Sequence, residues 1–141
     1  MREARHKDVT VLLVEDDHVD AMAIERSFAK AGVGNPLVRA VNGLEALEKL
    51  TNNKIPLPYI ILLDLNMPRM NGLEFLTELR GNPDIADSIV FVLTTSEKDE
   101  DKASSHRKNV AGYFLKNEVG VGFPNVLAMI EGYWKIAHLP S

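Results

Sequence analysis

The 141-residue sequence contains no cysteine, which excludes disulfide bonds, thiolate nucleophiles and cysteine-based zinc clusters. It also lacks any apolar run near the roughly 20 residues that a membrane-spanning helix needs. The first eight residues are mostly charged and have neither the apolar stretch nor the cleavage site of a signal peptide. We therefore expect one soluble cytoplasmic domain, residues 9–141, preceded by a short tail, residues 1–8.

Excess positive charge is absent as well. The formal net charge is -4, and no basic stripe is available to displace counterions from nucleic-acid phosphates, so we expect no nucleic-acid binding by this chain. The four histidines show none of the four-residue spacing that places two metal ligands on one helix face. We accordingly assign them no role in metal binding.

Five short apolar runs, rich in β-branched residues, predict strands at 9–14, 37–41, 59–63, 89–93 and 113–115. The segments that follow them carry apolar residues three and four positions apart, which is typical of a helix, although 98–109 is mostly polar. Asn42 with Glu45 and Asn71 with Glu74 mark two helix starts, since each fits a cap residue followed three positions later by glutamate. Strand and helix in alternation predict an α/β fold with a five-stranded parallel sheet, doubly wound by five helices.

Polar side chains follow four of these strands, at the edge where an open α/β sheet binds its ligand. They are Glu15, Asp16, Asp17, Asp64, Thr94, Thr95 and Lys116. Two carboxylates ~4 Å apart repel by about 4 kcal/mol at an effective dielectric near 20, so their gathering requires positive charge. Oxygen ligands without sulfur favour Mg²⁺ or Mn²⁺, while Lys116 and Thr94 have the donors to hold a phosphoryl group.

Asp17, the two threonines and Lys116 also have a structural interpretation, whereas Asp16 is less easily explained in that way. Asp17 fits the N-cap of the following helix, with Asp20 supporting it from three residues on. A lone threonine or lysine at a strand end is more often structural or solvated than functional. The functional hypothesis therefore depends on their joint occurrence at four strand ends.

Four segments carry a family resemblance: LLVEDD at 12–17, LDLNMPRMNG at 63–72, LTTS at 93–96 and GYFLK at 112–116. Together they resemble the receiver domains of bacterial response regulators, over about residues 9–137. Within that family the chain is most similar to short receivers that act with bacterial phytochrome kinases, judged by the Thr94-Thr95-Ser96 turn and by Tyr133-Trp134. The resemblance implies a flavodoxin-like strand order, 2-1-3-4-5.

By the same resemblance Asp64 is the phosphoacceptor and a sensor histidine kinase is its donor. Asp16, Asp64 and the main-chain carbonyl of Asn66 would bind Mg²⁺, with Glu15 acting through metal-bound water. Thr94 and Lys116 would hold the phosphoryl group, and Tyr113 would be the switch residue, the alternative being that its ring simply packs on the sheet.

The sequence departs from the family after Lys116, where Asn117 replaces the usual cis proline. A cis peptide without proline costs about 2.5 to 4 kcal/mol, so we expect a trans bond there.

Three other functions fit the sequence less well. A phosphatase with an aspartyl nucleophile would have a second acid two residues later, where this sequence has Asn66. A nucleotide binder would have a glycine-rich loop after the first strand, where this sequence is acidic. A receiver that binds partners without phosphorylation would not need the complete acid, threonine and lysine set. We therefore expect a phosphorylation switch, not an enzyme, that signals by protein contact or onward phosphotransfer.

The last helix predicts a further interaction. Its apolar residues cover an arc of roughly 180°, whereas packing on the sheet needs only ~100°. They are Val126, Leu127, Met129, Ile130, Tyr133, Trp134, Ile136 and Ala137. We expect a homodimer through this side of the fold, the alternative being that the C-terminal tail folds back over it.

Overall fold

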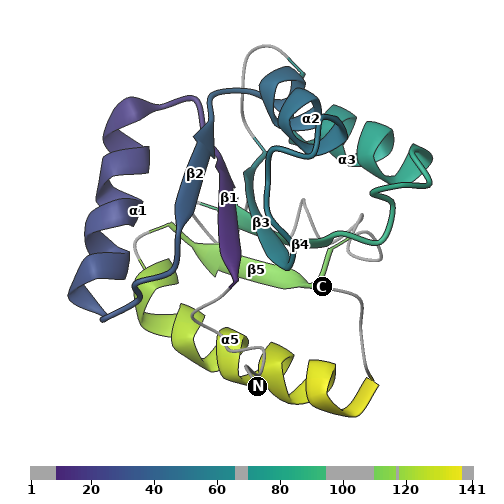
Figure 1. Ribbon diagram of the computed structural model, residues 1–141. Coiled ribbons are helices and arrows are strands. Elements are labelled where there is room, and N and C mark those ends of the chain that lie inside the picture. The colour runs from purple at the N-terminus through teal and green to yellow at the C-terminus, as the bar shows by residue number, and fades with distance from the viewer. Residues whose placement is uncertain (1–8, 66–69, 95–109, 117, 138–141) are drawn as a thin grey trace.

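The computed structural model describes residues 9–65, 70–94, 110–116 and 118–137, with side chains through residue 128 (Figure 1). The elements are β1 (Thr10–Val14), α1 (His18–Lys30), β2 (Leu37–Ala40), α2 (Gly43–Thr51), β3 (Tyr59–Asp64), α3 (Gly72–Gly81), β4 (Ile89–Thr94), β5 (Gly112–Leu115) and α5 (Val119–Ala137). Four of the five expected helices are among the described residues, and the remaining one, expected at 98–109, lies outside them.

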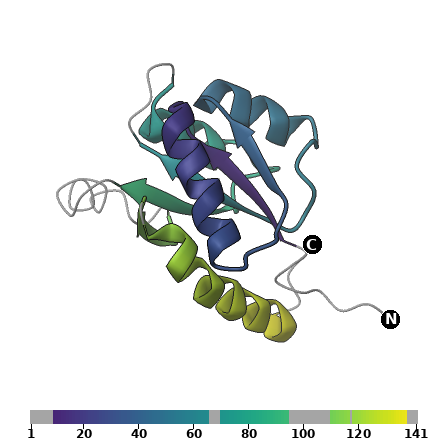
Figure 2. The ribbon, with the colours of Figure 1, turned by 90° about the vertical axis from the view of Figure 1, so that its left-hand side faces the viewer.

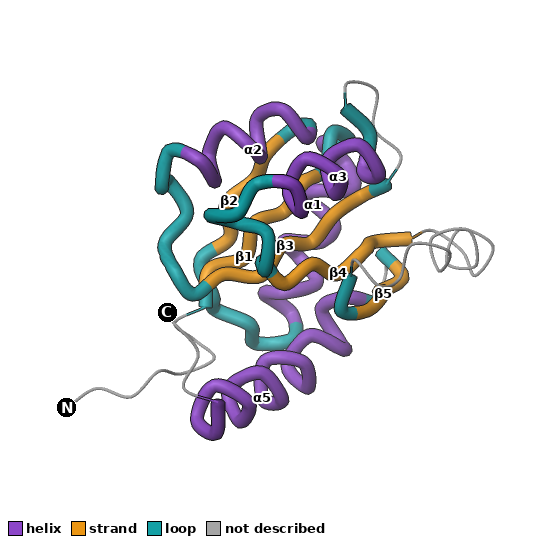
Figure 3. Tube along the Cα trace, turned by 90° about the vertical axis from the view of Figure 1, so that its right-hand side faces the viewer, coloured by secondary structure: helices purple, strands orange, loops and turns teal. Residues whose placement is uncertain are grey.

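All five strands form one parallel sheet in the order β2-β1-β3-β4-β5 (Figure 3). The predicted flavodoxin-like fold is confirmed, and every strand boundary lies within one residue of its prediction. The central strands β1 and β3 are buried along almost their whole length, because helices cover both faces of the sheet.

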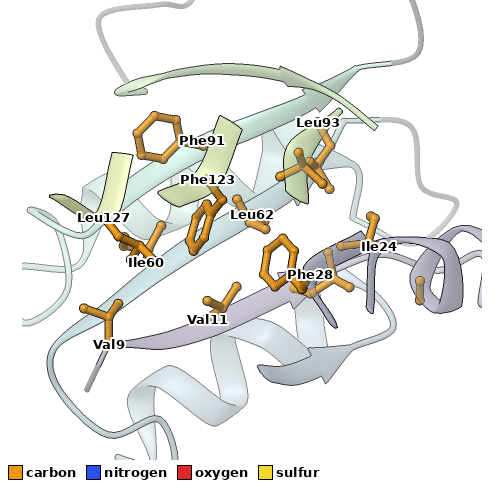
Figure 4. Close-up of a cluster of buried hydrophobic side chains, with 13 residues drawn as sticks. Val9, Val11, Ile24, Phe28, Ile60, Leu62, Phe91, Leu93, Phe123 and Leu127 are labelled. Atoms are coloured by element: carbon orange, nitrogen blue, oxygen red, sulfur yellow. The ribbon is translucent and has the colours of Figure 1, made fainter. Parts of the chain in front are cut away.

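The two faces carry separate apolar layers. Helices α1 and α5 cover one face and α2 and α3 the other (Figures 1 and 2). On the first face Phe28 of α1 stacks on Phe123 of α5, with ring centroids 4.9 Å apart, above Val11 and Leu62 of the sheet (Figure 4). Every third or fourth residue of a helix meets the sheet, which explains the apolar spacing in the sequence.

All three predicted cap residues, Asp17, Asn42 and Asn71, are confirmed, and the complete reciprocal capping box forms at α3. Asp17 caps α1 by accepting hydrogen bonds from the backbone N–H groups of Val19 and Asp20, at 2.8 and 3.0 Å. Asn71 and Glu74 form the complete capping box predicted for α3.

The cap of α2 differs from the predicted box. The side chain of Asn42 accepts from the Glu45 N–H, but the Glu45 carboxylate accepts from the Val41 N–H at 2.6 Å, not from that of Asn42. The reciprocal bond is therefore shifted by one residue, because the chain enters α2 with Asn42 almost fully extended.

Helices α1 and α5 meet at a glycine, and this contact yields a stability prediction. Gly120 donates its backbone N–H to the Ser27 hydroxyl at 3.0 Å, and a Cβ at Gly120 would overlap that hydroxyl and the Ser27 carbonyl. We expect Gly120→Ala to lower the free energy of unfolding by about 1–3 kcal/mol, because the helices must separate. Urea unfolding followed by circular dichroism measures this.

Gly81→Ala is the matched control. Gly81 is the last residue of α3, and a Cβ there would have no neighbour within 4 Å. Alanine should leave stability unchanged or raise it slightly. Equal unfolding free energies for the two variants would contradict a tight contact at Gly120.

Candidate functional site

Three carboxylates meet at the C-terminal edge of the sheet. Glu15 and Asp16 follow β1, Asp64 ends β3, and one ligand atom from each lies within 4.8 Å of the others. Glu15 and Asp64 are buried, and Asp16 is the most accessible of the three. The strand register brings them together, because β1 and β3 are neighbours in which Val14 pairs with Leu63, directly before Glu15 and Asp64.

Lys116 supplies the positive charge in this cluster. Its Nζ lies 2.8 Å from Asp20 Oδ2, 2.9 Å from Glu15 Oε1 and 3.5 Å from Asp64 Oδ2. The backbone N–H of Lys116 donates to the Thr94 carbonyl at 2.8 Å, which continues the pairing of β4 and β5 and fixes the base of the lysine side chain. The structure thus places Lys116 among the acids, although Asn117 replaces the usual proline after it.

The other predicted residues fall in three places. Thr94 ends β4 with a buried side chain, and its Oγ1 is 3.5 Å from the Phe114 carbonyl oxygen. Tyr113 is half-buried on β5, paired in register with Val92. Asn66 and Asn117 lie outside the described residues, as does Thr95.

Arg39 of β2 is a site residue that the sequence analysis missed. Its Nε donates to the Glu15 carbonyl at 2.9 Å, and a terminal nitrogen donates to the Asp16 carbonyl at 3.0 Å. The other terminal nitrogen is 3.2 Å from His18 Nδ1. The guanidinium therefore fixes the backbone of the turn that carries both acids, through its rigid fork of donors.

Asp20 is the second residue that was missed. The sequence analysis gave it only a supporting part in the α1 cap, whereas its carboxylate accepts a hydrogen bond from Lys116, 96 positions away. Both omissions share one cause, since a contact between distant segments leaves no local sequence pattern.

Burial and charge shift two pKa values here. Burial, with the Asp64 charge adding to it, raises the pKa of Glu15 to about 7 despite the hydrogen bond and charge of Lys116. Burial alone would lower the pKa of Lys116, but its hydrogen bonds to Asp20 and Glu15, with the charge of Asp64, raise it above its ordinary value. At neutral pH Lys116 is charged, and Glu15 is divided between its two forms.

The raised pKa of Glu15 predicts a pH-dependent stability for the metal-free protein. Because the folded form binds this proton more tightly, the stabilisation from Glu15 is greatest below its ordinary pKa of 4.5 and is lost as the pH rises through about 7. Glu15→Gln imitates the protonated form, so we expect the variant to gain stability relative to the wild type between pH 5 and pH 8. Urea unfolding in EDTA at several pH values measures the difference, and a constant difference would contradict it.

The acid cluster fits a divalent cation. The cluster has three carboxylates, of which Glu15 and Asp64 lie near Lys116, all the donors are oxygen, and Asp16 leaves the site accessible from solvent. Mg²⁺ and Mn²⁺ prefer such ligands and commonly retain water. Within the described part of the chain, no helix is long and apolar enough to span a membrane.

Comparison with known proteins gives one consistent result. A family model described as the response regulator receiver domain matches residues 11–121. Response regulator Rcp1 from Synechocystis sp. is 30% identical over 138 residues, which cover 95% of this chain and 94% of Rcp1. The solved Mn²⁺-bound form of Rcp1 has a TM-score of 0.64 at 31% identity, covering 89% of this chain and 91% of that one.

Two further solved structures are similar. The bacteriophytochrome response regulator RtBRR has a TM-score of 0.71 at 29% identity, covering 88% of this chain and 77% of its own. The phosphorylated cyanobacterial phytochrome response regulator RcpA has a TM-score of 0.66 at 30% identity, and the match covers 90% of this chain and 94% of RcpA.

Proposed function

Because the chain belongs to the receiver-domain family of two-component response regulators, we propose that Asp64 accepts a phosphoryl group from a sensor histidine kinase in a Mg²⁺-dependent reaction. The observation that carries this proposal is the meeting of Asp64 with Glu15, Asp16 and Lys116 at one edge of the sheet. The phosphorylated form of the similar protein RcpA supports it.

The reaction is an in-line displacement. A carboxylate oxygen of Asp64 forms a bond to phosphorus as the bond from phosphorus to the donor breaks, and the donor leaves as imidazole or, from acetyl phosphate, as acetate. This brings negative groups together, so the transition state depends on positioning and on nearby positive charge. Lys116 supplies one such charge, and the Thr94 hydroxyl supplies a hydrogen bond to a phosphoryl oxygen.

Mg²⁺ would be held by Asp16, Asp64 and the main-chain carbonyl of Asn66, with Glu15 acting through bound water. When bound, the cation offsets the charge that develops on the transferred phosphoryl group. Mn²⁺ is an alternative ion, and the Mn²⁺-bound structure of Rcp1 supports a divalent site. Attack of water on the acyl phosphate then releases inorganic phosphate and restores Asp64, which limits the lifetime of the signal.

The output is a conformational change. Phosphorylation adds about -1.5 to -2 charges beside Thr94. Thr94 then turns toward the phosphoryl group, and the half-buried Tyr113 ring takes the space that it vacates. This rearrangement signals to a protein partner.

The similarity to phytochrome response regulators makes a bacterial phytochrome the candidate kinase. The match to Rcp1 covers 94% of that protein, so this chain spans nearly the whole length of that relative.

Intact-mass measurement tests the function directly. Incubation with acetyl phosphate and Mg²⁺ should add the mass of one phosphoryl group, and EDTA should prevent the addition. A phosphatase would instead release phosphate continuously without a stable adduct, and a nucleotide binder would gain no mass. Absence of any adduct with acetyl phosphate or phosphoramidate at saturating Mg²⁺ would overturn the proposal.

The homodimer is the remaining prediction on partners. In the described part of α5, Val119, Phe123 and Leu127 are buried against the sheet, whereas Val121 is 77% exposed. The side chains from Met129 onward, on which most of the apolar arc depends, lie outside the description. We expect light scattering over a dilution series to give a dimer mass, with an affinity that changes on adding beryllofluoride. A monomer mass at high concentration in both states would contradict this.

A further inference from the structure

We propose that Asp20 is a positioning residue that holds Lys116 against Asp64, an inference that rests on the proposed function. Lys116 Nζ lies 2.8 Å from Asp20, 2.9 Å from Glu15 and 3.5 Å from Asp64, and its contact with Asp20 is a hydrogen bond. It lies on the first turn of α1, across the site from β5, and takes no part in the three-acid cluster.

The donors of the lysine explain how this contact works. An ammonium group has three N–H donors, and Lys116 Nζ has three carboxylates within 3.5 Å. The contact with Asp20 is a hydrogen bond and the short contact with Glu15 Oε1 is an ion pair, which leaves N–H donors of Nζ available to Asp64. With Asp20 in place, the flexible four-carbon side chain is kept beside the Asp64 carboxylate, which would accept the phosphoryl group.

When a cation is bound, a larger share of the restraint on Lys116 would come from Asp20. Glu15 lies in the cluster that would share its charge with the cation, so its attraction for Lys116 weakens when the cation binds. Asp20 lies outside that cluster, so its attraction for Lys116 is not weakened in the same way. In the form competent for phosphoryl transfer, Asp20 is therefore the main partner that restrains Lys116.

Chemical labelling tests the contact without any phosphorylation. We expect Asp20→Ala to raise the rate at which acetic anhydride acylates Lys116 several-fold, measured by mass spectrometry with the other lysines as internal standards. Asp20→Asn, which keeps an acceptor and loses the charge, should give an intermediate rate. Asp84→Asn removes one charge from an exposed acid elsewhere and should change nothing. An unchanged Lys116 rate in Asp20→Ala overturns the proposal.

Phosphorylation kinetics test the consequence. At saturating Mg²⁺ we expect Asp20→Ala to be phosphorylated by acetyl phosphate about tenfold more slowly, the effect of losing one charge-assisted hydrogen bond. The Mg²⁺ midpoint should stay at the wild-type value, because no cluster ligand is removed. A wild-type rate, or a rate loss explained by a shifted Mg²⁺ midpoint, overturns the positioning role.

The two proposals fail in different ways. If the wild-type protein is never phosphorylated, the proposed function is wrong and the labelling experiment alone decides whether Asp20 restrains Lys116. If the wild type is phosphorylated and Asp20→Ala matches it, the function stands and the positioning role is wrong.

Discussion

Asp64→Asn is expected to abolish acid-labile phosphorylation by acetyl phosphate. Asp64 ends the central strand β3 with its carboxylate buried at the meeting point of Glu15 and Lys116. Asparagine has nearly the same shape but no carboxylate nucleophile, so no acyl phosphate forms. The variant should still fold, because it removes a charge from a buried cluster that already repels itself.

Intact mass after incubation with Mg²⁺ and acetyl phosphate measures the loss. Asp84→Asn makes the same chemical change at an exposed residue and should be phosphorylated at the wild-type rate. Circular dichroism confirms that both variants are folded. Stable incorporation into Asp64→Asn at the wild-type rate would show that another residue is the acceptor, and peptide mapping would locate it.

The sheet was predictable because its signal is local. Strands buried on both faces are continuous apolar runs, so β1, β3 and β4 were visible in 9–14, 59–63 and 89–93 to within one residue. Polar residues directly after such runs must lie at the carboxyl edge of a parallel sheet. That rule predicts the proximity of Glu15, Asp16 and Asp64 from the sequence alone.

The supporting contacts were not predictable, because they depend on which way side chains reach across the fold. Arg39 contacts the turn after β1 from the neighbouring strand, 24 and 23 positions away from Glu15 and Asp16. The Asp20 contact with Lys116 spans the site from α1 to the end of β5. Neither the Arg39 contacts nor the Asp20 contact produces a periodicity or spacing that a single sequence reveals. The Asp17 cap is predictable because its hydrogen-bond donors lie only two and three positions further along the chain.

The turn after β1 and the Lys116 side chain are held in place by different kinds of contact. Arg39 binds main-chain carbonyls, so it holds the turn whichever side chains the turn carries. Lys116 instead depends on side-chain charge from Glu15, Asp20 and Asp64. Removing the Asp16 side chain should therefore leave both the turn and the lysine in place, which makes Asp16 a suitable position for testing cation binding alone.

Asp16→Ala is expected to weaken Mg²⁺ binding about tenfold to a hundredfold. Loss of a residue that only hydrogen-bonds to a metal ligand typically weakens metal binding by this factor, and loss of a direct ligand should weaken it at least as much. Asp16 is the most accessible of the three acids, and its contact with Arg39 is through the backbone. At limiting Mg²⁺ the phosphorylation rate should fall in the same proportion, and raising Mg²⁺ should recover part of it because Asp64 remains. Calorimetric titration with Mg²⁺ measures the affinity.

Asp17→Ala is the matched control variant for Asp16→Ala. Asp17 caps α1 through Val19 and Asp20, so its loss should cost about 1 kcal/mol of unfolding free energy while the Mg²⁺ affinity stays at the wild-type value. Asp16→Ala should show the opposite pattern, with stability retained or raised in the metal-free protein, since one repelling charge is gone. If Asp16→Ala binds Mg²⁺ as tightly as the wild type and its phosphorylation remains equally Mg²⁺-dependent, Asp16 is not a ligand, and the cation must be held by Glu15 and Asp64 without it.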